Sequence, residues 1–471
     1  MSPERLKRVP DAADGEPEPV GRCSSVIPRA RQLVVLAITA ALLWLSGVPQ
    51  PGTTGAGAGA HPETGPVSVG SVAAASMSSS MSSSRMATVP VPPARRGGVI
   101  RRDLFGMHLL HTRTSWPSVP ITHLRLWDTQ TTWNRLQPTR TRWDWQRLDE
   151  TVANARRNGA RVTMTLGQTP TWASSRPRQR SPYGLGAAAP PRSMADWRAY
   201  VRAVATRYRG SIEAYEIWNE PNWSEYWTGS SAQLAAMTRE ASRVIRAVDP
   251  KALVVTPSWV PVDGLNDRRM REYFAAGAGR YIDAVAVHLY ATTPEASLQF
   301  LSRVRRSMAA QGVGRLPVWN TEITYGRRKR GERYSATKSV GVVARTFLLA
   351  PYSTQRRIYW YAWDDWDFGS TELWSRRTGR PTPAARAYRE VYDWMVGSRD
   401  QGCTVSRQVW SCAFALRTGG RGLAVWSVGA ATSRRVPSGY HRIRYLNGQV
   451  TGTAPGRSVR LTSSPVLLTT R

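Results

Sequence analysis

The chain has 471 residues, 41% of them hydrophobic and 21% charged, which is the composition of a globular protein with one large domain and room for a smaller module. Its net charge of +33 comes almost entirely from arginine spread along the chain, and an anionic partner such as an acidic polysaccharide or a membrane surface would suit it. An arginine-rich coding bias is the alternative explanation, and no nucleic-acid-binding motif accompanies the charge. We therefore expect no nucleic-acid partner, and the charge alone does not identify a substrate.

The first predicted element is an export signal in residues 1–60. Residues 33–48 form an uncharged apolar run preceded by arginines, shorter than the roughly 20 residues of a comfortable spanning helix. Ala58 and Ala60 have the spacing of a cleavage site, so this segment is either a cleaved signal peptide or an uncleaved membrane anchor. Either way we expect the remainder of the chain outside the cytoplasm, secreted or tethered to the membrane. Residues 61–98 are rich in Ser, Met, Ala, Pro and Gly, which predicts a disordered linker.

From residue 99 to residue 397, short apolar runs alternate with longer amphipathic segments, as expected for repeated βα units. Strands are predicted at 104–110, 123–127, 161–166, 214–218, 253–257, 284–289, 317–320 and 357–362. Helices are predicted at 145–158, 194–209, 231–248, 294–311, 334–349 and 383–394. Eight strands with their connections over about 300 residues predict an α/β fold, the (β/α)8 or TIM barrel.

Residues 398–471 change to short alternating strands with turn signals, which predict a small all-β module. Its strands are predicted at 404–406, 410–416, 422–428, 441–446 and 465–470. The module would either complete the packing of the barrel or bind substrate. Cys403 and Cys412 are predicted to form a disulfide that closes a hairpin, which suits an oxidising compartment. No other ligand lies at metal-binding spacing around them, and we expect no metal site and no cofactor.

The strongest motif is Asn219-Glu220-Pro221, at the carboxyl end of the fourth predicted strand. A second carboxylate, Glu322, follows the seventh, and catalytic groups of a TIM barrel emerge at this end of the strands. Glycosidic cleavage builds positive charge on the anomeric carbon and negative charge on the departing oxygen. One carboxyl must therefore donate a proton while the other stabilises or attacks the carbon. The two glutamates predict such a catalytic pair, and a buried structural carboxylate is the alternative interpretation of each.

With both motifs in place, the predicted barrel resembles the clan A retaining glycoside hydrolases, which carry Asn-Glu-Pro on strand four and a glutamate on strand seven. It is most similar to the family 39 and family 5 enzymes, of the cellulase and β-xylosidase type. The resemblance implies that Glu220 is the acid/base and Glu322 the nucleophile of a double displacement on a polysaccharide or oligosaccharide. It also implies that Asn219 binds the sugar 2-hydroxyl.

Further substrate-binding residues follow from the same resemblance. Arg125 resembles the arginine that keeps the nucleophile ionised and oriented, and His288 and Tyr290 close the sixth strand, where Tyr290 would donate a hydrogen bond to Glu322. Trp363 resembles the aromatic floor of the first sugar subsite. Aromatic residues expected to line a substrate groove are Trp127 and Trp172, with Trp133, Trp223, Tyr226 and Trp227 as weaker candidates. Each of these residues has an alternative interpretation as an ion-pair or packing residue.

Two other functions fit the same residues. A transglycosylase that remodels exopolysaccharide would use the same two glutamates, and a cell-surface polysaccharide-binding barrel would use neither. The presence of both Glu220 and Glu322 argues against the second. No sugar-recognition signature is found in the loops after strands one and three, so the sugar, the linkage and endo or exo action stay open. We expect a monomer with a carbohydrate substrate.

Overall fold

The computed structural model describes residues 97–111, 116–261, 264–326, 332, 334–365 and 368–471. The predicted export signal and nearly all of the predicted linker lie outside these residues. Among the helices of the described part, none combines the length and the apolarity that crossing a membrane requires.

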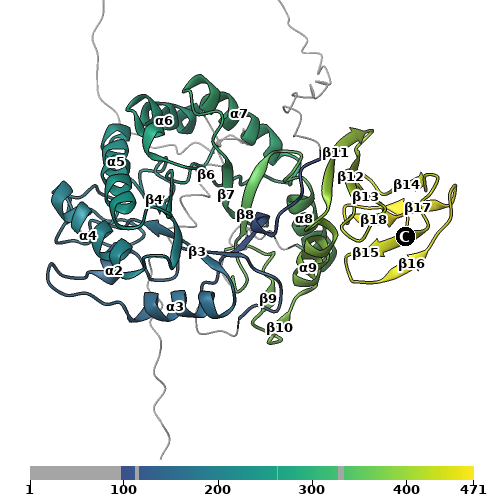
Figure 1. Ribbon diagram of the computed structural model, residues 1–471, viewed down its shortest axis with the longest axis horizontal. Coiled ribbons are helices and arrows are strands. Elements are labelled where there is room, and N and C mark those ends of the chain that lie inside the picture. Colours follow the sequence, from purple (N-terminus) through teal and green to yellow (C-terminus); the bar gives the residue numbers. More distant parts are fainter. Residues whose placement is uncertain (1–96, 112–115, 262–263, 327–331, 333, 366–367) are drawn as a thin grey trace, which may run out of the picture.

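An eight-stranded parallel sheet occupies the centre of the molecule, in the order β5-β4-β3-β2-β1-β8-β7-β6 (Figure 1). Its strands are β1 (Phe105–Met107), β2 (His123–Leu126), β3 (Arg161–Leu166), β4 (Ile212–Ile217), β5 (Leu253–Val255), β6 (Val285–Val287), β7 (Val318–Ile323) and β8 (Gln355–Trp360). The edge strands β5 and β6 meet through isolated parallel bridges, Val255 with Ala284 and Trp259 with Val287. The sheet therefore closes on itself, and the predicted (β/α)8 barrel is confirmed.

Helices surround the strands, as Figure 1 shows. They are α2 (Trp133–Leu136), α3 (Gln146–Arg157), α4 (Met194–Arg207), α5 (Ser231–Val248), α6 (Gly264–Ala275), α7 (Ser297–Ala310), α8 (Ala336–Leu348) and α9 (Pro383–Met395), with short 3-10 turns η1 (Arg102–Leu104) and η2 (Ala278–Tyr281). Side-chain caps mark several starts: Ser230 and Gln233 form a capping box on α5, and Thr382 caps α9 just before Pro383. Helix α6 was not predicted, because arginines interrupt its apolar positions.

Strand β7 is longer than predicted and carries Glu322 inside it rather than after it. The prediction stopped at Asn320 because Asn320, Thr321 and Glu322 are polar, and a polar run carries no strand signal. All six residues of β7 are nevertheless buried. The first strand was predicted at 104–110 and was too long at both ends, since Leu104 ends the turn η1 and residues 108–110 lie beyond β1.

An ion-pair network lies at the amino end of the barrel strands. Glu213, at the start of β4, pairs with Arg161 at 2.8 Å, Arg357 at 2.8 Å and His123 at 3.1 Å. Burial opposes ionisation of Glu213, but hydrogen bonds from His123 and Arg357 outweigh it and hold the pKa of this carboxyl well below its usual range. The network joins β2, β3, β4 and β8 at the end away from Glu220.

The β-module (residues 398–471) forms a six-stranded antiparallel sheet, in the order β11-β12-β13-β18-β15-β16, and a two-stranded sheet β14-β17. Its strands are β11 (Arg399–Ser406), β12 (Val409–Ala415), β13 (Arg421–Ser427), β14 (Thr432–Arg435), β15 (Arg442–Tyr445), β16 (Val450–Gly452), β17 (Ser458–Leu461) and β18 (Val466–Thr469); a hairpin of β9 (Trp374–Ser375) and β10 (Arg380–Pro381) precedes α9. Strands β14, β16 and β17 were missed because β14 and β16 are largely exposed and β17 is a short strand with only two buried apolar residues.

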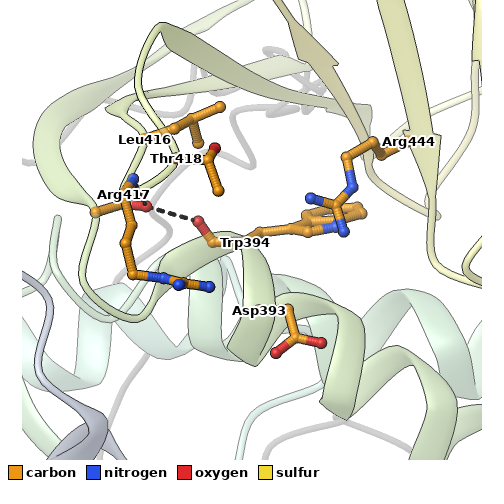
Figure 2. A pocket seen from close by; sticks show the side chains of 7 residues that line it. Asp393, Trp394, Leu416, Arg417, Thr418 and Arg444 are labelled. Atoms are coloured by element: carbon orange, nitrogen blue, oxygen red, sulfur yellow. Dashed lines mark hydrogen bonds between the residues drawn. The ribbon is translucent and has the colours of Figure 1, made fainter. Parts of the chain in front are cut away.

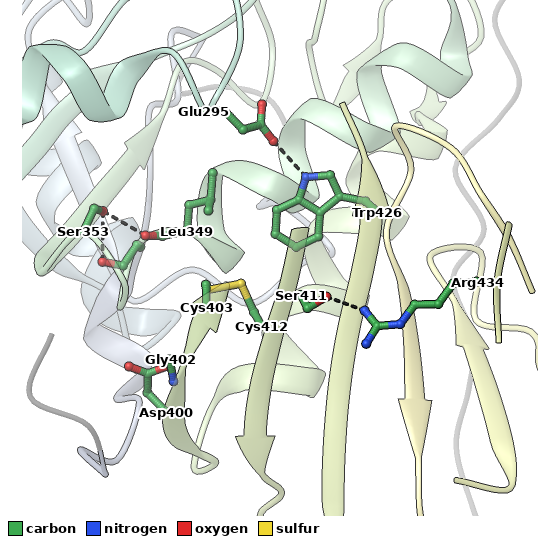
Figure 3. The surroundings of a disulfide bond; sticks show 11 residues. Glu295, Leu349, Ser353, Asp400, Gly402, Cys403, Ser411, Cys412, Trp426 and Arg434 are labelled. Atoms are coloured by element: carbon green, nitrogen blue, oxygen red, sulfur yellow. Dashed lines mark hydrogen bonds between the residues drawn. A yellow bond between two sulfur atoms is a disulfide. The ribbon is translucent and has the colours of Figure 1, made fainter. Parts of the chain in front are cut away.

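The β-module packs against the barrel beside α8 and α9 (Figure 1). Cys403 of β11 and Cys412 of β12 face each other and form the predicted disulfide (Figure 3). Close by, the Trp426 indole donates a hydrogen bond of 2.9 Å to Glu295, whose other oxygen pairs with Arg345 of α8 at 2.8 Å. The buried contact between the β-module and the barrel is thus anchored by a charge-assisted hydrogen bond.

Candidate active site

Glu220 is placed by a strained backbone at the end of β4. Trp218 and Glu220 have φ angles of 80° and 45°, in the left-handed region that side chains other than glycine rarely adopt. Asn219 between them bridges to Ser258 after β5, and the Glu220 N–H donates to the Ser258 hydroxyl at 3.2 Å. These contacts fix the Asn219-Glu220 turn, and both side chains are buried.

Arg125 of β2 organises the carboxylates inside the barrel. The fully buried guanidinium donates to Glu216 at 2.5 and 3.3 Å, to Glu322 at 3.0 Å and to the Asn219 side-chain Oδ1 at 2.7 Å. Thr165 adds a hydrogen bond of 3.2 Å to Glu216. Arg125 is thus shared by two glutamates, of which Glu216 takes the bidentate contact.

Both oxygens of Glu322 have donors. One accepts from Arg125, and the other accepts the predicted hydrogen bond from the Tyr290 hydroxyl at 2.5 Å. Burial raises the pKa of Glu322 to about 7, although Arg125 and Tyr290 favour the ionised form; the nearby charges of Asp128 and Glu216 act in the same direction as burial.

Glu220 contacts His288, with 2.8 Å between the His288 Nδ1 and a carboxylate oxygen. Burial, with the charge of Arg125 and the neighbouring His108, holds the pKa of His288 well below its usual value. The imidazole is therefore neutral at physiological pH, and its Nδ1 can accept a hydrogen bond from a protonated Glu220 carboxyl. One ligand atom each of Glu220, His288 and Glu322 lies within 4.8 Å of the others.

A divalent cation could also bind two carboxylates and an imidazole at this spacing. Arg125 and Tyr290 already hydrogen-bond both oxygens of Glu322, however. A metal ion would compete with both donors and would be repelled by the buried guanidinium. The contacts favour a proton-transfer site over a metal site.

Aromatic rings border the carboxylates on two sides. The Tyr361 hydroxyl donates to Asp128 at 2.9 Å, and its ring lies edge-on to His108 at 4.9 Å. Burial and then the charges of Asp128, Asp365 and Glu322 raise the pKa of Tyr361 well above its usual value, which places this ring close to the nucleophile candidate. Trp363 instead packs against Trp374 at 5.8 Å and is only 1% exposed, compared with 8% for Tyr361. These contacts favour the alternative interpretation of Trp363 as a packing residue.

Trp127 lies on the Glu220 side. Its indole donates to the Tyr183 hydroxyl at 2.9 Å, and Tyr183 packs against Tyr226 at 5.5 Å. Burial, with contributions from Glu220 and Asp128, raises the pKa of both tyrosines. Trp127, Tyr183 and Tyr226 therefore form one wall near Glu220.

The remaining tryptophans are further from the carboxylates. Trp172 contacts the Gln137 carbonyl at 2.9 Å and lies under Arg140 at 4.6 Å. Trp133 stacks on Tyr200 at 4.7 Å and is fully buried, as is Trp227. The groove-lining interpretation of Trp133 and Trp227 was wrong, because these rings are core residues of the barrel. Trp223 is half-buried.

Three residues of the site were missed from the sequence: Glu216, Asp128 and Tyr361. Glu216 is the fifth of the six residues of β4, and Glu220 lies three residues beyond the end of that strand. Asp128 directly follows Trp127, and Tyr361 directly follows β8, two residues before Trp363. Their positions at or just after the carboxyl ends of strands were the available signal.

The fold and the site agree with comparisons to known proteins. The model of the family Cellulase (glycosyl hydrolase family 5) matches residues 121–369, whereas no curated protein matches the chain. A family 39 glycoside hydrolase from the gut symbiont Bacteroides cellulosilyticus WH2 is similar, with a TM-score of 0.63 and 15% identity over 79% of this chain and 81% of that one. The family 39 enzyme from Xanthomonas axonopodis pv. citri has a TM-score of 0.55 and 17% identity, over 80% and 95% of the two chains. A family 30 endoxylanase from Clostridium papyrosolvens C71 has a TM-score of 0.55 and 14% identity, over 80% and 98%.

At these identities the structural likenesses show the fold, which is that of the clan A glycoside hydrolases. The family match spans more than half of the chain and contains the strands that carry Arg125, Glu220, His288 and Glu322. The chain therefore belongs to glycosyl hydrolase family 5, and the protein is a glycosidase with a carbohydrate substrate.

Proposed function

We propose that the protein is a retaining glycoside hydrolase that cleaves a polysaccharide or oligosaccharide, with Glu220 as acid/base and Glu322 as nucleophile. The observation that carries this proposal is the separation of the two carboxylates, whose oxygens lie within 4.8 Å. Retaining enzymes hold the pair about 5 to 5.5 Å apart, whereas inverting enzymes leave about 6.5 to 9.5 Å for a water molecule.

The surroundings of each glutamate support its role. Arg125 and Tyr290 hold Glu322 by both oxygens, which orients a carboxylate for attack on the anomeric carbon. Glu220 faces the neutral His288, which can accept a hydrogen bond from a protonated carboxyl. A single proton shared by the pair therefore rests best on Glu220, away from the guanidinium.

In the first step, Glu322 forms a bond to the anomeric carbon while the glycosidic bond breaks and Glu220 gives its proton to the departing oxygen. Covalent bonding removes the negative charge of Glu322, which lowers the pKa of Glu220 and lets it take a proton from water. That water then attacks the anomeric carbon, and Glu322 leaves as a carboxylate. Asn219, held by Arg125 and near Ser258, is the candidate for binding the 2-hydroxyl.

The test is hydrolysis of a panel of aryl glycosides and polysaccharides by the full chain, compared with Glu220→Ala and Glu322→Ala. We expect a loss of at least about 10³-fold in kcat for Glu322→Ala on any substrate cleaved by wild type. Azide should rescue Glu322→Ala as a glycosyl azide of inverted configuration and Glu220→Ala as one of retained configuration. Activity that survives either substitution would mean that the pair is misassigned.

We also propose that the protein acts outside the cytoplasm. The apolar run 33–48 supports export, and the Cys403–Cys412 disulfide suits an oxidising compartment. Cell fractionation with mass spectrometry of the protein tests this proposal. A new amino terminus after Ala60 indicates a cleaved signal, and an intact amino terminus in the membrane fraction indicates an anchor. Retention of all the protein in the cytoplasm contradicts the proposed export.

A further inference from the structure

The net positive charge per residue is about twice as high in the β-module as in the barrel. Residues 398–471 contain 11 arginines and a single acidic residue, Asp400, whereas residues 99–397 contain 45 basic and 25 acidic residues. At the barrel's frequency of acidic residues the β-module would hold about six. A coding bias toward arginine explains added arginines, but it does not explain why acidic residues are missing from one module only.

The arginines of the β-module have few carboxylate partners. Within the described part of the chain, the ion pair formed by a β-module arginine joins Arg444 to Glu390 of α9 at 3.5 Å. In the barrel, by contrast, surface arginines such as Arg140 and Arg207 pair with Asp196 and Asp149. The β-module therefore presents uncompensated positive charge, which favours an anionic partner.

A pocket of about 230 Å³ lies where the β-module meets α9, and its lining contains Arg417, which has no ion pair among the described residues, and Arg444, which pairs with Glu390. Figure 2 shows Arg417 and Arg444 on opposite sides of it, with Asp393 and Trp394 contributed by α9. Trp394 is 1% exposed and lies on the α9 side of the pocket.

The chemistry of the lining indicates what would bind. Two guanidinium groups suit a carboxylate, while Asp393 and the Thr418 hydroxyl suit the hydroxyl groups of a sugar. A nucleic acid fits less well, because Asp393 repels closely spaced phosphates and the described Phe, Tyr and Trp rings of the β-module are all buried or half-buried, which leaves no open stacking platform for bases. An acidic sugar therefore matches the pocket better than a phosphate backbone does.

We propose that the pocket between α9 and the β-module binds a carboxylate-bearing sugar, so that the arginine-rich module holds an acidic polysaccharide beside the barrel. The pocket lies outside the active site. Its lining residue Ser398 accepts a hydrogen bond from the Arg417 N–H through its hydroxyl and another from the Ile100 N–H through its backbone carbonyl. Ile100 precedes β1, at the end of the barrel opposite to Glu220 and Glu322. Binding at this pocket is independent of the reaction proposed for Glu220 and Glu322.

The test is affinity electrophoresis of the full chain in gels that contain polygalacturonate, dextran sulfate or neutral dextran. We expect retardation by polygalacturonate and none by neutral dextran. Replacing both pocket arginines, Arg417→Gln with Arg444→Gln, should weaken the polygalacturonate interaction at least about tenfold. The matched control is Arg435→Gln with Arg460→Gln, which removes the same charge from exposed positions of β14 and β17 and should weaken binding less than about threefold.

Equal weakening by the two double variants would overturn the pocket in favour of diffuse charge. Stronger retardation by dextran sulfate than by polygalacturonate would mean that the ligand is a sulfated sugar and not a carboxylated one. Tighter binding of single-stranded DNA than of polygalacturonate would mean that the ligand is not a sugar. The single variant Arg417→Gln controls for misfolding of the double variant, because this exposed side chain forms no ion pair within the described residues. Its loss should still weaken binding about threefold. Hydrolysis of a neutral aryl glycoside should stay at the wild-type rate in every variant. The electrophoresis measures binding without catalysis, so a failure of the proposed reaction would leave its outcome unaffected.

Discussion

Arg125 is one cation held between two buried carboxylates, and its contacts are unequal. Glu216 takes two of its hydrogen bonds and Glu322 takes one. Because Glu216 neutralises much of the guanidinium charge, burial prevails at Glu322 and the pKa of that carboxyl rises to about 7. Glu216 therefore acts on the reaction through Arg125, as a positioning residue.

Glu216→Gln should change the pH dependence of catalysis. The substitution removes a negative charge near Glu322, and the positive charge of Arg125 then acts mainly on Glu322. Both effects lower the pKa of Glu322. We expect the acid limb of kcat/KM to move to lower pH by about one unit. The matched control is Glu213→Gln, the same change at the other end of β4, which should leave the limb in place. An acid limb unmoved in Glu216→Gln contradicts the positioning role.

Glu322→Gln should stabilise the protein more at high pH than at low pH. The folded pKa of Glu322, about 7, lies above that of a glutamate in the unfolded chain, about 4.3. Between these values the folded protein keeps a proton that the unfolded chain releases, so the stability contributed by this residue falls as the pH rises. The gain in Tm of Glu322→Gln over wild type should be larger at pH 8 than at pH 5. An equal difference at both pH values would count against the raised pKa.

At the scale of elements, the amino ends of the barrel strands carry stability and the carboxyl ends carry chemistry. Glu213→Gln should lower the free energy of unfolding by about 2 kcal/mol at pH 7, because Arg357 and His123 lose a partly buried carboxylate. The pKa of Glu213 is depressed, so this contribution is present above the unfolded pKa and is lost as the pH falls through the acid range. Denaturant unfolding at pH 7 and pH 3.5 measures the effect, which should be smaller at pH 3.5 without vanishing, because the folded pKa of Glu213 lies well below that pH. The kcat should not change, and an equal loss of stability at both pH values would point to packing instead.

Most elements of the barrel could be predicted from the sequence because their apolar residues follow the periods of strands and helices. The errors in the predicted strands and helices occur where polar residues interrupt these periods. β7 was cut short at Asn320 because its last residues are polar and face the site, and α6 was missed because arginines break its pattern. In the β-module, the exposed polar residues of β14 resemble a loop, and β17, its partner, is too short to give a clear alternation.

The candidate site was predicted in part. Arg125, Asn219, Tyr290 and both proposed catalytic glutamates are brought together because each stands at or near the carboxyl end of a strand. The choice of Trp363 over Tyr361 depended on the path of the chain after β8, which sequence patterns do not define. Glu216 resembled an ordinary strand residue until Arg125 was seen beside it.

At the scale of the whole molecule, the β-module is held to the barrel by close backbone packing. A Cβ on Gly341 of α8 would lie 2.5 Å from the carbonyl oxygen of Ser463, in the loop between β17 and β18. Gly341→Ala should therefore displace that loop and lower the free energy of unfolding by about 1 to 3 kcal/mol, measured by thermal or denaturant unfolding. Gly452→Ala is the matched control, since a Cβ added there would have no heavy atom of the described residues within 4 Å. Equal stability of the two variants would mean that the loop moves freely.

The first described residues enter the molecule beside β11, where the Gly97 N–H donates to the Asp400 carbonyl at 2.7 Å and the Ile100 N–H donates to the Ser398 carbonyl at 2.8 Å. This junction lies before β1, at the amino end of the barrel strands, whereas Glu220 and Glu322 stand at the carboxyl end. The protein thus has a polarity, because residue 97 enters the barrel on the face opposite to the proposed catalytic pair. Under the proposal that residues 33–48 anchor the protein, a large surface-bound substrate reaches the catalytic face from the side away from the anchor.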